Sequence, residues 1–397
     1  MNKLYIIGTF DTKRDELLYA KQVAEEAGAE TVTVDVGTRE ASPGADVPAS
    51  TVAACHPDGA GSVLGLFDRG AAVTAMAKAL SIYLAKQENI GGVLGLGGSG
   101  NTALATEAMR SLPIGVPKLM LSTVASGNTA PYMGPNDIAM MYSVVDIAGL
   151  NAISRTVIAN AANAAAGMAL NQRERSGSSR PLGMTMFGVT TDCVTQLRAV
   201  LEETHDICVF HATGVGGQSM EKLADSGYFT GLLDITTTEI PDLLYGGVFA
   251  ATEDRFGAAI RTGLPYLGSV GACDMVNFAA RDTVPEKFEG RNLYVHNANV
   301  TLMRTTEAEN REIGRFIVSR INRMEGPVRF LLPLRGVSAL DAPDMPFHDP
   351  HADAALFEEI RAGWREAPNR RLVEVDAHIN DPAFADAVIE NFNSISA

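Results

Sequence analysis

The sequence predicts an α/β protein with two Rossmann-like domains, each a parallel sheet flanked by helices, and a cleft between the domains. Short apolar runs alternate with helix-forming stretches along the whole chain. This alternation restarts after residues 171–181, a polar segment with the composition of a linker. A chain of 397 residues is also long for a single hydrophobic core. We therefore expect an N-terminal nucleotide-binding domain over residues 1–175 and a C-terminal α/β domain over residues 182–397.

The charge balance narrows the range of partners. Lys+Arg number 32 against 47 Asp+Glu, which gives a formal net charge of −15. Such a chain is poorly suited to the phosphate backbone of nucleic acids or to an anionic membrane surface. A small anion can still be bound, because backbone N–H groups hold anions without any net positive charge.

Several features predict a cytoplasmic protein. The four cysteines are scattered singly on apolar segments, a pattern that favours reduced thiols over disulfides or a zinc site. The chain enters its first strand at once and shows no signal-peptide pattern. Its longest apolar-rich stretch, residues 138–170, is interrupted by Asp146 and Arg155 and is not expected to cross a membrane.

The first predicted strand, residues 3–8, leads through residues 9–13 into a helix that ends near Gly28 and then into a strand over residues 31–36. Such a β-α-β unit predicts a parallel sheet, which binds ligands beyond the carboxyl ends of its strands. In the loop at that end, Thr9 and Thr12 can bond a phosphate or ribose, Asp11 a ribose or metal, and Lys13 supplies a positive charge. Alternatively, Asp11 and Thr12 simply cap the helix.

A glycine cluster follows the strand predicted at residues 91–96. It reads Gly97-Gly98-Ser99-Gly100-Asn101 and leads directly into a helix. Glycines let the backbone approach a ligand closely, and the first N–H groups of a helix lack internal acceptors. The cluster matches neither the P-loop nor the dinucleotide-binding pattern, so a glycine-rich turn without a ligand remains the alternative.

A third strand end, after residues 118–121, is also rich in hydroxyl groups and small residues. Three polar strand ends at one edge of a sheet favour a nucleotide or another phosphorylated ligand. The residues predicted to bind it are Thr9, Phe10, Asp11, Thr12, Lys13, Gly97, Gly98, Ser99, Gly100, Asn101, Ser122, Thr123, Ala125, Ser126, Gly127 and Gly134.

A helix over residues 151–170, rich in alanine and asparagine, ends the first half. Its small residues predict close packing, either at a domain or subunit interface or in the core of the first domain. In the second half, strands are expected over residues 182–189, 206–210, 231–235, 265–270, 293–295, 328–332 and 372–375.

The second of these strands delivers another glycine cluster to the start of a helix. Its residues Gly214, Gly216 and Gly217 are predicted to bind substrate together with Arg335, which follows a later strand.

The catalytic candidates are His211, Glu239, His296 and Arg304. The two histidines follow strands expected at the same crevice edge, where they could form an acid/base set with Glu239, while Arg304 could clamp a carboxylate or phosphate. Alternatively, the histidines bond loop backbone and the arginine forms a structural salt bridge. No local histidine pair predicts a metal site, and no G-x-S-x-G pattern predicts a serine nucleophile.

Six segments resemble a family of uncharacterised bacterial and plant proteins related to the N-terminal ATP-binding region of the tomato mosaic virus resistance protein. They are GTFDTK at 8–13, LGLGGSG at 94–100, SVVDIAGLN at 143–151, HATGVGG at 211–217, LPLRGVS at 332–338 and HINDP at 378–382. The resemblance extends over essentially the whole chain. It implies two α/β subdomains, ATP in the N-terminal one, and self-association, with a dimer as the simplest homo-oligomer.

Taken together, these observations predict that the N-terminal domain binds ATP. The phosphates would contact residues 97–101 and 9–13, and residues 122–127 would complete the wall of the binding site. The first reaction class is phosphoryl transfer to a small acidic substrate near the four catalytic candidates, with Mg²⁺ bridging the phosphates. One alternative is a nucleotide-dependent binding or regulatory protein without turnover. Another is an oxo-acid lyase or isomerase whose glycine loops hold a phosphate of the substrate.

Overall fold

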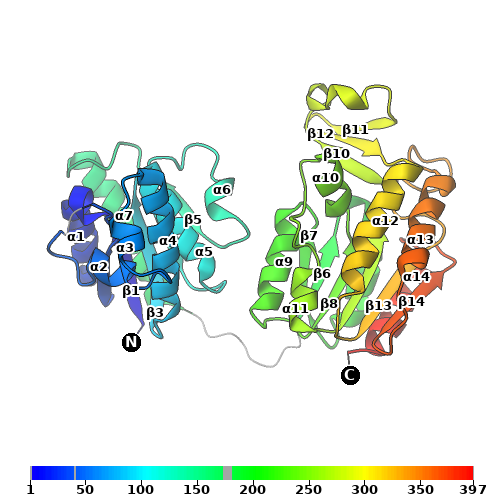
Figure 1. Ribbon diagram of the computed structural model, residues 1–397, viewed down its shortest axis with the longest axis horizontal. Helices are drawn as coiled ribbons and strands as arrows, with labels where there is room; N and C mark the ends of the chain where they lie inside the picture. Colours follow the sequence, from blue (N-terminus) through cyan, green and yellow to red (C-terminus); the bar gives the residue numbers. More distant parts are fainter. Residues whose placement is uncertain (1, 40–41, 173–180, 397) are drawn as a thin grey trace. The chain divides into compact units, whose positions relative to one another are not determined.

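The computed structural model describes residues 2–39, 42–172 and 181–396. They divide into two compact units, Met1–Arg175 and Ser176–Ala397, and each contains a parallel sheet with helices on both faces (Figure 1). The predicted α/β class with two parallel, helix-flanked sheets is thus confirmed. Most of the predicted linker, residues 173–180, lies outside the described residues.

The N-terminal unit is built on a five-stranded parallel sheet with the strand order β2-β1-β3-β4-β5. The strands are β1 (Lys3–Gly8), β2 (Thr31–Asp35), β3 (Ile90–Gly97), β4 (Lys118–Ser122) and β5 (Ala139–Tyr142). The helices are α1 (Phe10–Glu26), α2 (Ala49–Ala53), α3 (Gly61–Leu64), α4 (Arg69–Ala85), α5 (Ser99–Ser111), α6 (Ala130–Met133) and α7 (Ala152–Leu170).

Alternating side chains of β1 and β3 form two cores on opposite faces of this sheet. Ile6 and Leu94 pack with α1 and α7, whereas Ile7 and Val93 pack with α2, α4 and α5. The alanine-rich α7 lies directly against α1 and β3. Of the two alternatives for this helix, the structure therefore supports burial in the core of its own domain.

Successive strands are added on opposite sides of β1 in this sheet. The chain leaves β1 for β2 on one side and returns to β3 on the other side, so the connections after β1 and β3 diverge. In doubly wound sheets such a switch point leaves an open crevice beyond the carboxyl ends of the two strands.

The C-terminal unit repeats this arrangement with six parallel strands in the order β14-β13-β9-β8-β6-β7. The strands are β6 (Pro181–Met186), β7 (Asp206–His211), β8 (Gly231–Thr236), β9 (Tyr266–Gly271), β13 (Val328–Pro333) and β14 (Arg370–Val375). The helices are α8 (Thr191–Leu201), α9 (Val215–Asp225), α10 (Glu239–Tyr245), α11 (Gly257–Thr262), α12 (Glu307–Ile321), α13 (Pro350–Gly363) and α14 (Pro382–Asn393). Helices α8 and α14 cover one face, and α9, α11, α12 and α13 cover the other.

A small antiparallel sheet is inserted between β9 and α12, at the top of the unit in Figure 1. It has the order β10-β12-β11, with β10 (Met275–Phe278), β11 (Leu293–Asn297) and β12 (Val300–Arg304). The assignment of residues 293–295 to the parallel sheet was therefore wrong. β11 turns back through a tight hairpin to pair with β12, and a hairpin joins antiparallel strands.

No helix within the described ranges is both long enough and apolar enough to span a lipid bilayer.

Candidate functional site

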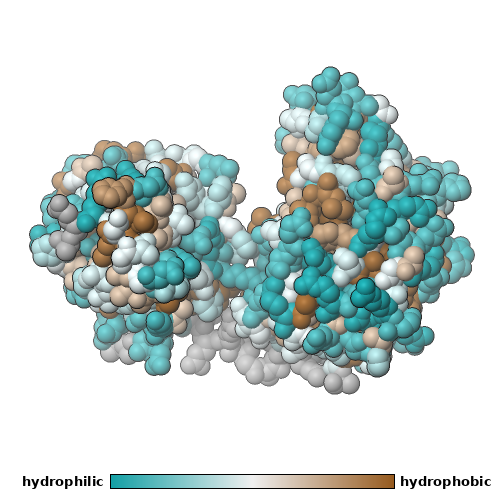
Figure 2. Space-filling view, viewed as in Figure 1, coloured by the Kyte–Doolittle hydropathy of each residue, from teal (hydrophilic) through white to brown (hydrophobic). Residues whose placement is uncertain are grey.

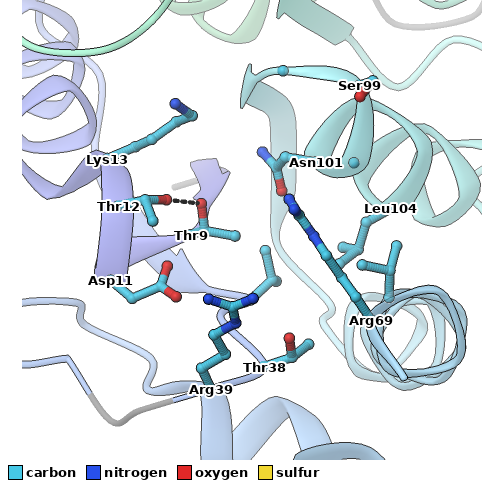
Figure 3. Close-up of a pocket in the computed structure, with 14 residues that line it drawn as sticks. Thr9, Asp11, Thr12, Lys13, Thr38, Arg39, Arg69, Ser99, Asn101 and Leu104 are labelled. Carbon is cyan, nitrogen blue, oxygen red and sulfur yellow. Dashed lines mark hydrogen bonds between the residues drawn. The ribbon is translucent and has the colours of Figure 1, made fainter. Parts of the chain in front are cut away.

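A pocket of about 360 Å³ lies at the switch point of the N-terminal sheet (Figure 3). Its walls come from the connections after β1, β2 and β3 and from the first turns of α4 and α5. We call it the switch-point pocket. The predicted ligand-binding residues that line it are Thr9, Asp11, Thr12, Lys13, Gly98, Ser99, Gly100 and Asn101.

The start of α5 presents unpaired backbone amides to this pocket. Gly98 is the N-cap and supplies no side-chain acceptor. Within the described part of the chain, the first N–H of the helix with an acceptor is that of Thr102, which donates to the Gly98 carbonyl at 2.9 Å. The N–H groups of Ser99, Gly100 and Asn101 therefore make the helix start an anion-binding end.

Asn101 adds a further unsatisfied group. Its Nδ2 donates to the Leu96 carbonyl, but its Oδ1 is buried without a hydrogen-bond partner. A Cβ at Gly97 would lie 2.7 Å from that of Asn101, so only glycine fits at the end of β3. Gly97 thus shapes the turn and does not itself line the pocket.

Positive charge dominates the walls of the switch-point pocket. Lys13, Arg39 and Arg69 line it, against the single carboxylate of Asp11. Figure 3 shows the side chains of Arg39 and Arg69 extending into the cavity, with that of Arg69 directed towards Asn101. Neither guanidinium has a hydrogen-bond or ion-pair partner among the residues that the structure describes. The Lys13 ammonium donates to the Ile147 carbonyl.

Asp35, at the end of β2, explains why Asp11 is available to the pocket. Its Oδ1 accepts hydrogen bonds from the N–H groups of Phe10 at 3.0 Å and Gly37 at 2.8 Å, whereas the N-cap of α1, Thr9, makes no side-chain capping bond. Burial raises the pKa of Asp35, an effect that the two backbone hydrogen bonds oppose. Because the N-cap of α1 is Thr9 and Asp35 accepts the first N–H of the helix, Asp11 and Thr12 are not its caps. Phe10 is buried in the core.

The predicted third wall lies outside the pocket. Ser122 is fully buried, and its hydroxyl shares a 2.6 Å hydrogen bond with that of Thr102, which fastens α5 to β4. Also outside the lining are Thr123, Ala125, Ser126, Gly127 and Gly134.

The opposite wall is formed by Thr38 and Arg39 after β2 and by Arg69 at the start of α4. Sequence reasoning missed these residues. The signal that could have revealed them is an arginine in the connection after a parallel strand and another at a helix start.

The second glycine cluster has a different role. At the start of α9, the N–H groups of Gly214 and Gly217 donate to Glu239 Oε1 at 2.7 and 3.0 Å. A Cβ at Gly217 would lie 2.1 Å from the Glu239 carboxylate, and one at Gly216 would lie 1.8 Å from the His211 carbonyl oxygen. These glycines therefore make room for a carboxylate of the protein itself, which occupies the place that a substrate phosphate would need.

Glu239 belongs to a buried ion network centred on Arg255. The guanidinium bonds Glu239 at 3.0 Å, Glu221 at 3.2 Å and both oxygens of Asp234 at 2.7 Å. Three carboxylates around one buried cation leave excess negative charge, and burial raises the pKa of Glu221 to about 7. Glu239 is completely buried in this network, so it is not exposed to a substrate.

The two predicted arginines also make internal contacts. Arg304 is buried and donates to the Phe347 carbonyl and to the Asp353 carboxylate, each at 2.7 Å, so it anchors the segment before α13. Arg335 is exposed and pairs with Asp376 at 2.7 Å.

His211 and His296 do lie together. They line one pocket of about 200 Å³ with Phe187, Gly188, Val189, Phe249, Asn297, Val300 and Leu302. We call it the two-histidine pocket. It excludes Glu239 and Arg304, so the four catalytic candidates do not form a single site. Across residues 2–39, 42–172 and 181–396, no group of three or more His, Cys, Asp or Glu side chains is placed to hold a metal ion.

Comparison with known proteins gives matches over nearly all of this chain. The model of the uncharacterised protein family UPF0261 matches with its N-terminal domain over residues 2–174 and with its C-terminal domain over residues 180–396. A UPF0261 protein of Rhizobium meliloti is 53% identical over 396 residues, covering 100% of both chains. One from Clostridium tetani is 44% identical over 97% of both. The ToMV resistance protein Tm-1(GCR237) of Solanum lycopersicum is 41% identical over 99% of this chain and 56% of its own length.

The Arg255 network predicts a specific pH dependence of stability. The pKa of Glu221 is about 7 in the folded protein against an ordinary value of 4.5. Its contribution to stability is therefore fully present below pH 4.5 and is lost as the pH rises through 7. Glu221→Gln carries no titratable group there. Relative to the wild type, its free energy of unfolding should rise by roughly 3 kcal/mol at most between pH 4.5 and 7.5.

Urea unfolding, followed by the fluorescence of Trp364, measures the difference in free energy of unfolding between the variant and the wild type. Trp364 is the one tryptophan of the chain and lies in the C-terminal unit together with Glu221. Glu203→Gln, at an exposed position, is the matched control and should track the wild type at every pH. Parallel stability curves for the wild type and Glu221→Gln would contradict the prediction.

Proposed function

Because this chain belongs to the UPF0261 family, a family known by sequence and not by reaction, we propose a function from its switch-point pocket. The N-terminal unit binds a nucleotide through its phosphates. The observation that carries this proposal is the uncapped start of α5, whose amides face a cavity that also holds two arginines with no hydrogen-bond or ion-pair partner among the described residues. ATP is the first candidate because the resemblance to an ATP-binding region suggests it.

The lining assigns a role to each part of such a ligand. The N–H groups at the start of α5, with Arg39 and Arg69, bind phosphate oxygens. The hydroxyls of Thr9 and Thr12, 2.9 Å apart, face the same space. Asp11, as the lone lining carboxylate, is placed to hold a ribose hydroxyl or a phosphate-bound Mg²⁺.

The nucleobase fits the α4 side of the pocket. The apolar residues that line the pocket are Val36, Val73 and Leu104. Two residues before Arg69, Phe67 is fully exposed at 106%. In the view of Figure 2, hydrophobic residues are visible at the surface near α3. A cavity of about 360 Å³ is at the small end of ligand pockets. We therefore place the phosphates and ribose inside and the base at the mouth, stacked on Phe67.

This proposal concerns binding, and turnover is a separate question. Phosphoryl transfer to a small acid is the first reaction to assay, with Mg²⁺ present. The alternative of a nucleotide-dependent regulatory protein gains support if ATP binds and no phosphate is released with any acid tested. Self-association into a homo-oligomer stays a prediction, and light scattering with and without ATP tests it.

Gly98→Asp tests the anion-binding end of α5. Gly98 has the extended backbone of an N-cap, with φ −81° and ψ −169°, and a Cβ there meets only Thr123 Oγ1, at 3.7 Å. The new carboxylate should cap the helix and raise the free energy of unfolding by about 0.5 kcal/mol. Because it occupies the phosphate site, it should also weaken ATP binding at least tenfold, measured by isothermal titration calorimetry.

Gly98→Ala is the matched control, because it adds a Cβ without an acceptor and should leave ATP affinity nearly unchanged. Unaltered ATP binding by Gly98→Asp would refute the proposed phosphate site.

Phe67→Ala tests the placement of the base. Stacking of one base on an aromatic ring is worth about 1–3 kcal/mol, so this variant should lose about tenfold in ATP affinity. Its affinity for inorganic tripolyphosphate, which has no base, should not change. Phe67→Tyr should retain ATP binding, and Val144→Ala, at a position 57% exposed in the same unit, serves as the control. An equal loss for both ligands, or no loss for either, would show that the base lies elsewhere.

A further inference from the structure

The two-histidine pocket combines an apolar interior with few polar groups. Phe187 and Leu302 are almost fully buried in its wall, and Phe249 and Val300 pack against the same cluster. The ring of His211 meets that of Phe187 edge to face, with 5.2 Å between centroids. In the view of Figure 2, hydrophobic residues are exposed on the C-terminal unit below the inserted sheet and near α10. A ligand that fits this pocket needs an apolar body.

The polar side chains of the pocket can form further hydrogen bonds. No ring nitrogen of His211 or His296 bonds another described residue. By contrast, the rings of His56 and His378 bond the Ser62 hydroxyl and the Ser338 carbonyl. Two imidazoles from separate elements, β7 and β11, thus line one cavity with ring nitrogens that bond no other described residue.

Asn297 makes the polar end rich in donors. Its Oδ1 already accepts a hydrogen bond from the Asn299 N–H at 2.9 Å, which leaves the Nδ2 protons available. Each imidazole ring offers at least one N–H in either protonation state. His211 as a whole is exposed, and partial desolvation of its ring lowers its pKa. Three donors around one opening match a group that only accepts hydrogen bonds, and an ionised carboxylate is such a group.

The size of the cavity limits the ligand further. About 200 Å³ is below the range of pockets that enclose drug-sized molecules, so a nucleotide does not fit. We propose that the two-histidine pocket binds a small carboxylic acid with an apolar body. The carboxylate lies at His211, His296 and Asn297, and the apolar body packs on Phe187, Phe249 and Leu302. This site is independent of nucleotide binding in the N-terminal unit.

Gly188 allows the pocket to be filled without disturbing the histidines. It lines the cavity, its φ is not in the left-handed region, and a Cβ there has no neighbour within 4 Å. Gly188→Leu therefore occupies the space of the apolar body and leaves both imidazoles in place. His351→Ala is the matched control for the histidine variants, since His351 is exposed at the start of α13.

The test is a ligand-observed NMR titration of the full chain with benzoate and 3-methylbutanoate. We expect millimolar or tighter binding of both, and at least tenfold weaker binding of acetate, which lacks the apolar body, and of benzyl alcohol, which lacks the carboxylate. His211→Ala and His296→Ala should each weaken benzoate binding about fivefold or more. Gly188→Leu should abolish it, and His351→Ala should not change it.

Trp364 fluorescence, which reports on the same unit, verifies that each variant is folded. The proposal is overturned if neither acid binds the wild type, if benzyl alcohol binds as tightly as benzoate, or if Gly188→Leu still binds benzoate. Saturating ATP should leave benzoate bound. Its displacement by ATP would place both ligands at one site and would also overturn the proposal.

Discussion

Backbone N–H groups at the start of a helix need acceptors, and the two glycine clusters of this chain meet that need in opposite ways. At α9 the acceptor is Glu239, held by Arg255 in a completely buried network. At α5 the N-cap is glycine, and the amides open onto a cavity beside Arg39 and Arg69. In the same strand–glycine–helix arrangement, the helix start is therefore capped by a carboxylate of the protein at α9, whereas at α5 the first amides have no acceptor among the described residues.

This contrast also explains how an acidic chain can attract an anion. The net charge of −15 describes the whole chain, but binding depends on the local potential, which decays over about 8–10 Å at physiological salt. The pocket at the α5 start is lined by three cationic side chains and one carboxylate. In the C-terminal unit the balance is reversed, since three carboxylates surround Arg255. Excess carboxylate beside a capped helix leaves no attraction for a phosphate there.

Local sequence patterns were sufficient for most strands of the two parallel sheets and for part of the candidate site, but β5, β10 and β12 were not predicted. Apolar runs and helix periodicity indicated both parallel sheets, and the residues after β1 and β3, such as Thr12 and Ser99, do line one pocket. Strand order is not encoded locally. Without it, the connection after β2 and the start of α4 could not be placed beside them, so Arg39 and Arg69 were missed. The role of Glu239 was hidden for the same reason. The amides that it caps belong to α9, which is separated in sequence from Glu239 by strand β8. The antiparallel pairing of β11 was misread because a short apolar run does not specify its partner.

The side chains that line the switch-point pocket determine whether the N-terminal unit could catalyse phosphoryl transfer by itself. Such a reaction needs a group to hold Mg²⁺ on the phosphates and a group to orient or deprotonate the acceptor. Among the described residues that line the pocket, Asp11 is the single carboxylate and no histidine is present. Asp11 can hold the metal or act as the base, but it cannot do both at once. Lys13 already donates to the Ile147 carbonyl, and the arginines stay protonated and serve as electrostatic clamps. These residues fit the proposed binding of a nucleotide, whereas phosphoryl transfer would need a second functional group in addition to Asp11.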